Sequence, residues 1–171
     1  MKTIIYSILF FATIGSIVFS CNNREETTDP SGISGSLTNH SDCKNLKPGD
    51  LKSDIADTMS CVNYAYNGSN HELAMKHLNA GFNCCPGKLY CTVNTINDTI
   101  IIREYETEQL CNCNCLFDLD LKLQDVVQGK YMVKFVEPYS GDQPELLFEM
   151  DLNSFSEGEF CVIRKLYPWG E

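Results

Sequence analysis

From Ser60 onwards the chain consists of short runs rich in β-branched and aromatic residues, separated by Gly, Asn, Asp and Pro. Such runs are typical of strands joined by turns. In the run 116–123, leucines alternate with charged residues, so one face of the strand is apolar and the other meets water. No stretch of about ten residues has the periodicity of a helix. The pattern therefore predicts an all-β domain.

We expect seven or eight strands in this domain, a number typical of small sandwiches and barrels. The expected strands are 61–66, 72–78, 89–95, 99–105, 116–123, 131–136, 146–152 and 159–166. Asn67-Gly68 and Asn97-Asp98 predict tight turns between successive strands, because these residues tolerate positive φ.

One local motif favours the sandwich. Gly129 lies between the runs 116–123 and 131–136, and Tyr131 begins the second run. The segment resembles the corner of immunoglobulin-like domains, in which a tyrosine after a glycine-bearing turn anchors the crossover between strands. We therefore predict an immunoglobulin-like sandwich, with a small β-barrel as the alternative.

The N-terminus has the order of a secretory signal peptide: Lys2, then a mainly apolar stretch from Ile4 to Phe19, then Ser20-Cys21. The apolar stretch is shorter than the roughly 20 residues that cross a bilayer. Residues 18–21 resemble a bacterial lipobox, in which the thiol is lipidated and cleavage falls just before it. We predict a lipoprotein signal peptide over 1–20 and lipidation of Cys21, whose acyl chains anchor the protein to the membrane.

Beyond Cys21 the sequence predicts a tether and one domain. No Asp follows the thiol, so we expect delivery to the outer membrane, with the protein periplasmic or surface-exposed. Residues 21–42 are mostly polar and predict a flexible tether. Residues 43–171 are the expected sandwich domain. The net charge of −10 argues against a nucleic-acid partner, whereas a protein or glycan ligand stays open.

The cysteines predict a disulfide framework of about four bonds. Apart from Cys21, the candidates are Cys43, Cys61, Cys84, Cys85, Cys91, Cys111, Cys113, Cys115 and Cys161. Outside the cytoplasm these thiols oxidise, and the odd count leaves at least one outside an intrachain bond. Two adjacent cysteines on an extended chain point to opposite faces, so Cys84 and Cys85 are expected to have different partners. Cys111, Cys113 and Cys115 would share one strand face at spacings too long to bond with one another.

A metal site is the alternative use of these cysteines. The candidate ligands are Cys84, Cys85, Cys113, Cys115 and His77, around Zn²⁺ or Cu⁺. The spacing lacks the paired C-x-x-C of zinc motifs, and the expected compartment is oxidising, so disulfides are favoured. A thiol redox function is a further alternative, although no C-x-x-C opens a helix here.

No catalytic residue is assigned from the sequence. A Ser/His/Asp triad is compatible with the composition, but no G-x-S-x-G motif is present. His71 and His77 could share a strand face, and His77 is favoured as a packed, hydrogen-bonded residue. Asp118 and Asp120 are expected to lie on a solvated strand face rather than in a cation site.

Three groups of residues resemble a set of Bacteroidetes lipoproteins of unknown function. They are the run from His77 through Asn79-Ala-Gly-Phe-Asn-Cys-Cys-Pro86, the run Cys113-Asn-Cys-Leu-Phe-Asp-Leu119, and Cys161 with Tyr167-Pro-Trp169. The resemblance implies a lipoprotein and no particular activity. The leading hypothesis is a membrane-anchored, non-enzymatic binding or structural module without a cofactor, and the alternative is a metal-binding or redox lipoprotein.

Overall fold

The computed structural model describes residues 32–44 and 56–166. Within these ranges it contains nine strands and no helix. The strands are β1 (Ser34–His40), β2 (Met59–Asn67), β3 (Glu72–Asn83), β4 (Leu89–Ile96), β5 (Thr99–Glu106), β6 (Asn114–Gln124), β7 (Lys130–Val136), β8 (Leu147–Asp151) and β9 (Glu157–Ile163). No helix among the described residues is long and apolar enough to cross a membrane.

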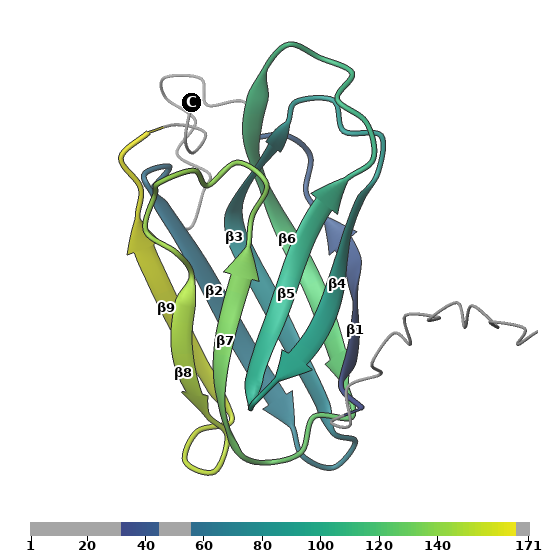
Figure 1. Cartoon of the computed structure of the whole chain (residues 1–171), viewed down its shortest axis with the longest axis vertical. Coiled ribbons are helices and arrows are strands. Elements are labelled where there is room, and N and C mark those ends of the chain that lie inside the picture. Colours follow the sequence, from purple (N-terminus) through teal and green to yellow (C-terminus); the bar gives the residue numbers. More distant parts are fainter. Residues whose placement is uncertain (1–31, 45–55, 167–171) are drawn as a thin grey trace, which may run out of the picture.

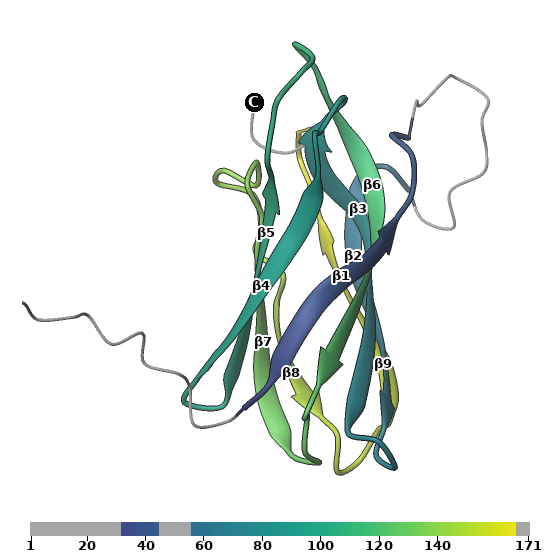
Figure 2. The same ribbon diagram turned by 90° about the vertical axis from the view of Figure 1, so that its right-hand side faces the viewer.

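The strands form two sheets that face each other (Figures 1 and 2). The five-stranded sheet has the order β1-β6-β3-β2-β9 and the four-stranded sheet has the order β4-β5-β7-β8. All pairs are antiparallel except β5 and β7, which run parallel. The predicted sandwich is confirmed and the barrel alternative is wrong, because the sheets do not close. The described chain contains nine strands rather than seven or eight.

The core lies between the sheets. It is built from the apolar residues that alternate along the strands, for example Leu119, Leu121 and Leu123 of β6, each at most 2% exposed. Aromatic rings complete it on the side of β8 and β9, where Phe148 stacks on Phe160 at 4.9 Å between ring centroids. Burial of such side chains is the main favourable term in folding.

Strand β1 corrects the prediction for the N-terminal part of the domain. Residues 34–40 were expected to belong to the tether, but they pair with β6. Ile33 is buried and Leu37 packs against the core, so two apolar contacts support this pairing. Gly35 allows a close approach to β4, because a Cβ there would lie 2.7 Å from Val93 Cγ2. The signal peptide, Cys21 and residues 167–171 lie outside the described residues.

A bulge extends β3 beyond the predicted end at residue 78. The register with β6 shifts between His77 and Ala80, and Asn79 takes a φ of 61°. The Asn79 amide donates to the backbone oxygens of Ala56 and Met59 at 3.0 and 2.7 Å. These bonds tie the bulge to the start of β2, and beyond it β3 pairs with β6 again as far as Asn83.

The turns agree with the sequence in two places out of three. The Tyr131 hydroxyl donates to the Val127 oxygen at 2.9 Å, as expected for a tyrosine corner. Asn97 and Asp98 both have positive φ in the two-residue loop between β4 and β5. The predicted tight turn at Asn67-Gly68 does not form: Asn67 is the last residue of β2, and the residue with positive φ in the loop 68–71 is His71.

Candidate functional site

Eight of the nine candidate cysteines pair in the structure. The bonds are Cys43–Cys115, Cys61–Cys161, Cys84–Cys113 and Cys85–Cys111. The expected number of disulfides is confirmed, and so is the expectation that adjacent Cys84 and Cys85 take different partners.

The expected placement of the C-x-C-x-C run on one strand face is wrong. Strand β6 begins at Asn114, so Cys111 and Cys113 precede it and only Cys115 belongs to the strand. Asn83 fixes the preceding loop: its side-chain amide donates to the Cys111 oxygen at 2.6 Å, and its Oδ1 accepts from the Cys111 N–H at 3.2 Å. The loop therefore stands across from the end of β3, where both partners of its cysteines lie.

Two disulfides adjoin each other at this end of the sandwich. The Sγ atoms of Cys43, Cys84 and Cys115 all lie within 4.8 Å of one another, and Cys113 is bonded to Cys84. Of the metal ligands named in the alternative interpretation of the sequence, Cys84, Cys113 and Cys115 lie here, together with Cys43. Cys85 pairs with Cys111 outside this cluster, and His77 lies in the core with other partners.

Cys91 is the one free cysteine among the described residues. It lies on β4, 9% exposed. Burial, together with the nearby Glu104 carboxylate, raises the pKa of the thiol to about 11, although a backbone hydrogen bond from Leu37 lowers it. Since the thiolate is the reactive form, Cys91 is expected to be inert in the folded protein at neutral pH.

Alkylation of a secreted Cys21→Ser variant should therefore label no cysteine in the native state and one cysteine in denaturant. The single label should map to Cys91, and intact mass spectrometry before and after alkylation reads both numbers. Three or more labels in denaturant would contradict the disulfide assignment.

A network of charged residues lies buried between the sheets. His77 of β3 and Arg164 after β9 face Glu104 of β5 and Glu137 after β7. His77 Nδ1 lies 2.8 Å from Glu104 Oε1, and Arg164 Nη2 lies 2.5 Å from Glu137 Oε2. His77 Nε2 is 3.7 Å from Glu137 Oε1, which links the two pairs. The side chains are at most 2% exposed.

Ser60 extends this network into a chain with the distances of a catalytic triad. Its Oγ lies 2.9 Å from His77 Nε2, on the opposite side of the ring from Glu104. The order serine, histidine and acid is that of an activated nucleophile. However, Ser60 and His77 are both 0% exposed, and the pocket of about 220 Å³ nearby is lined by Glu137 and not by Ser60. A substrate has no access to this serine in the described structure.

Electrostatics also argue for a structural role. Burial lowers the pKa of His77, but the Glu104 and Glu137 carboxylates outweigh this effect and the Arg164 charge, so the pKa is raised above the usual value. The carboxylates thus favour the protonated form of His77, and in this form the ring cannot accept a proton from Ser60. The positive charges of His77 and Arg164 then neutralise the two glutamate carboxylates. Charges are tolerated in a core when they are paired in this way.

Sequence reasoning missed the acidic members of this network, although a pattern points to them. Ile100, Ile102 and Glu104 occupy alternate positions on β5, and Val133, Phe135 and Glu137 do the same on and just after β7. Because alternate residues share a strand face, each glutamate continues an inward-facing apolar row. A charged residue in such a row predicts a buried partner of opposite charge.

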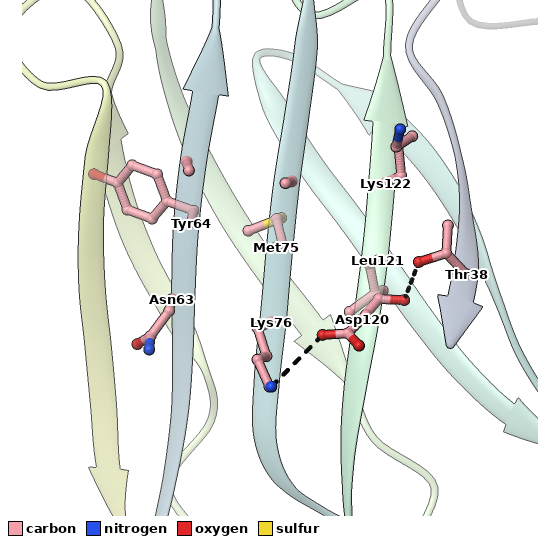
Figure 3. Close-up of a pocket in the computed structure, with 10 residues that line it drawn as sticks. Thr38, Asn63, Tyr64, Met75, Lys76, Asp120, Leu121 and Lys122 are labelled. Atoms are coloured by element: carbon pink, nitrogen blue, oxygen red, sulfur yellow. Dashed lines mark hydrogen bonds and ion pairs between the residues drawn. The ribbon is translucent and has the colours of Figure 1, made fainter. Parts of the chain in front are cut away.

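The outer face of the five-stranded sheet carries a shallow groove of about 310 Å³ (Figure 3). Ala65 of β2 and Ala74 of β3 are register partners and form its floor. Side chains around the floor are polar: Thr38, Asn63, Lys76, Asp120 and Lys122. Tyr64 takes no part in this polar rim, because its ring stacks on Phe148 on the core side of the sheet.

Contacts between strands fix the polar rim of the groove. Lys76 Nζ lies 3.8 Å from Asp120 Oδ1, and the Thr38 hydroxyl donates to the Asp120 backbone oxygen at 3.0 Å (Figure 3). Lys76 and Asp120 are nevertheless 49% and 41% exposed, so their polar atoms face solvent. The groove is thus a preformed surface with hydrogen-bonding groups around a small apolar floor.

The remaining predicted residues do not converge on a site. Asp118 forms an ion pair with Lys44 at 2.5 Å, and Asp120 faces Lys76, so both carboxylates have protein cations as partners. His71 lies in the exposed turn before β3, away from the buried His77. The two histidines therefore do not share a strand face. Comparison with protein-family models, curated proteins and solved structures finds no match for this chain.

Proposed function

We propose that this chain is an outer-membrane lipoprotein whose sandwich domain binds a glycan through the groove of Figure 3. The acyl chains on Cys21 hold the domain at the membrane, on its periplasmic or external side. The domain is a binding module rather than an enzyme. The observation that carries the binding role is the exposed alanine floor surrounded by polar side chains of β1, β2, β3 and β6.

Three features support the location. The first 21 residues have the order of a lipoprotein signal, and the segments around Cys84, Cys113 and Cys161 resemble Bacteroidetes lipoproteins. Four disulfides in one small domain are typical of proteins outside the cytoplasm.

The chemistry of the groove suits a hydroxyl-rich ligand. A carboxylate such as Asp120 accepts hydrogen bonds from sugar hydroxyls, and ammonium groups such as Lys76 and Lys122 donate to sugar oxygens. The methyl groups of Ala65 and Ala74 leave a flat floor for the C–H face of a sugar ring. An extended peptide instead binds mainly at sheet edges through backbone hydrogen bonds, which this face does not offer.

Replacing Cys21 by alanine should abolish acylation and release the protein from the membrane fraction. The reason is that the acyl chains are the only anchor in this proposal. Metabolic labelling with a fatty-acid analogue, followed by fractionation, reads both effects. A Cys91→Ala variant is the matched control and should stay labelled and membrane-bound. Unchanged labelling of the Cys21→Ala variant would contradict the lipoprotein assignment.

Replacing Lys76 or Asp120 by alanine should weaken glycan binding by about 10-fold, the usual effect of losing one hydrogen bond to a charged group. A panel of neutral and acidic oligosaccharides identifies the ligand, and calorimetry on the secreted domain gives the affinities. Lys134→Ala is the control, since Lys134 is also an ion-paired strand lysine but lies on the other sheet. The proposal fails if no oligosaccharide of the panel binds, or if all three variants lose the same affinity.

A further inference from the structure

Four cysteine sulfurs converge from three separate segments of the chain. Cys43 follows β1 and Cys84 follows β3. Cys113 immediately precedes β6, and Cys115 is the second residue of β6. The Sγ atoms of Cys43, Cys84 and Cys115 lie within 4.8 Å of one another, and Cys113 Sγ is bonded to Cys84 Sγ. We propose that these four cysteines, when reduced, form a four-thiolate site for a soft metal ion such as Zn²⁺ or Cu⁺.

Backbone hydrogen bonds hold the three segments together independently of the disulfides. The Cys84 N–H donates to the Cys113 oxygen at 2.9 Å, and the Lys44 N–H donates to the Leu116 oxygen at 2.8 Å. Phe82 and Cys115 are register partners in the β3–β6 pair. Breaking the two sulfur–sulfur bonds therefore leaves the four side chains at the same end of the sandwich.

The spacing of the Cys43, Cys84 and Cys115 sulfurs fits tetrahedral coordination after a small adjustment, and the bond to Cys84 places the Cys113 sulfur beside them. With Zn–S bonds near 2.3 Å, neighbouring sulfurs of a tetrahedron are about 3.8 Å apart. The present limit of 4.8 Å is within reach of side-chain rotation. Thiolate sulfur selects Zn²⁺ and Cu⁺ over hard cations such as Mg²⁺ and Ca²⁺.

The disulfide state and the metal state exclude each other, so the site is controlled by redox state. Each disulfide takes two electrons and two protons from one molecule of an external dithiol, which itself becomes a disulfide. Cys113 is exposed and gives the reductant access to the Cys84–Cys113 bond. The Cys84 thiolate that is released lies within 4.8 Å of both sulfurs of the Cys43–Cys115 bond. When Zn²⁺ binds, the four thiols lose four protons to become thiolates.

The test uses the chain from residue 22 onwards, made without its signal peptide and reduced with a phosphine under anaerobic conditions. Zn²⁺ is added, excess ion is removed, and elemental analysis gives the stoichiometry. We expect one zinc per reduced chain and none per oxidised chain. Co²⁺ in place of Zn²⁺ should give the thiolate charge-transfer bands of four-sulfur coordination.

Matched variants separate this cluster from the other cysteines. Cys84→Ser/Cys113→Ser should lose the bound zinc, whereas Cys85→Ser/Cys111→Ser should keep it, although each variant removes one disulfide from the same loop. Far-ultraviolet circular dichroism shows whether the reduced chain keeps its strands. Equal zinc content in both variants would overturn the proposal. A reduced wild-type chain that stays folded and binds no zinc would also overturn it. The same holds for a reduced chain that loses its strands and does not regain them when zinc is added.

Discussion

Replacing Arg164 by methionine should lower the free energy of unfolding by about 3–5 kcal/mol at neutral pH, because it leaves a buried carboxylate without its cation. The Arg164 and Glu137 side chains are 0% and 2% exposed, and Nη2 lies 2.5 Å from Oε2. The Arg164 guanidinium also donates to the Pro144 oxygen at 2.8 Å. Methionine fills much of the same volume but offers none of these bonds.

The loss should depend on pH. Burial raises the pKa of Glu137 above its usual value, although His77 and Arg164 lower it. Without Arg164 this pKa rises further. A raised carboxyl pKa favours the folded state only while the group is protonated, so the variant loses stability as pH rises from about 4.5 through the folded pKa. The difference from wild type is therefore smallest in acid and largest above the folded pKa.

Urea denaturation at several pH values measures these free energies. Lys134→Met is the control, because its partner Glu145 is exposed and a surface ion pair contributes less than about 1 kcal/mol. The double variant Glu137→Gln/Arg164→Met should regain part of the loss, since it removes the uncompensated charge. Equal losses for Arg164→Met and Lys134→Met would show that the buried ion pair contributes no more to the free energy of unfolding than the exposed one.

Removing the Cys61–Cys161 disulfide by alanine substitution should cost about 4 kcal/mol. This bond joins β2 to β9 and closes a loop with a sequence separation of 100, so it greatly restricts the unfolded chain. The Cys84–Cys113 bond within the loop shortens it by bridging 29 residues, which reduces the effect only slightly because the entropy depends on the logarithm of loop length. Cys61 is also 0% exposed, so its removal leaves space in the packed structure.

The Cys85→Ala/Cys111→Ala variant is the comparison for this prediction. The disulfide that this variant removes closes a sequence separation of only 26, and both of its cysteines are partly exposed. Its loss should be smaller by about 1 kcal/mol or more. Guanidinium denaturation of both variants, without reductant, gives the two values. Loss of more stability from the shorter loop would mean that native-state contacts, rather than loop length, decide the effect.

The sequence predicts the strands that bury an alternating face, because alternation and burial have the same physical cause. Strand β6 was predicted to within two residues at its start, and the hairpin of β4 and β5 to within one residue at each end. Strand β1 was missed because its stability comes from pairing with β6 rather than from its own two apolar residues. The bulge at Asn79 was missed because it depends on backbone partners far away in the chain.

The candidate sites were predictable only in part. The prediction that Cys84 and Cys85 have different partners is confirmed. It needs only local geometry, because neighbouring side chains on an extended chain point in opposite directions. The meeting of Cys43 with Cys115 depends on β1 lying beside β6, which the sequence did not indicate. The groove depends on which strands are neighbours in the sheet, and strand order cannot be obtained from alternation.

Strand β1 also determines how the domain would carry mechanical load from an anchor on its N-terminal side. It runs along the length of the sandwich beside β6 (Figure 2), with Ser34 opposite Gln124 and His40 opposite Leu119. Tension applied ahead of Ser34 acts along the strand, across its hydrogen bonds to β6, so these bonds share the force in shear. Beyond the far end of β1, Cys43 is bonded covalently to Cys115 of β6. If the hydrogen bonds give way, this disulfide stops the extension and passes the force to a central strand.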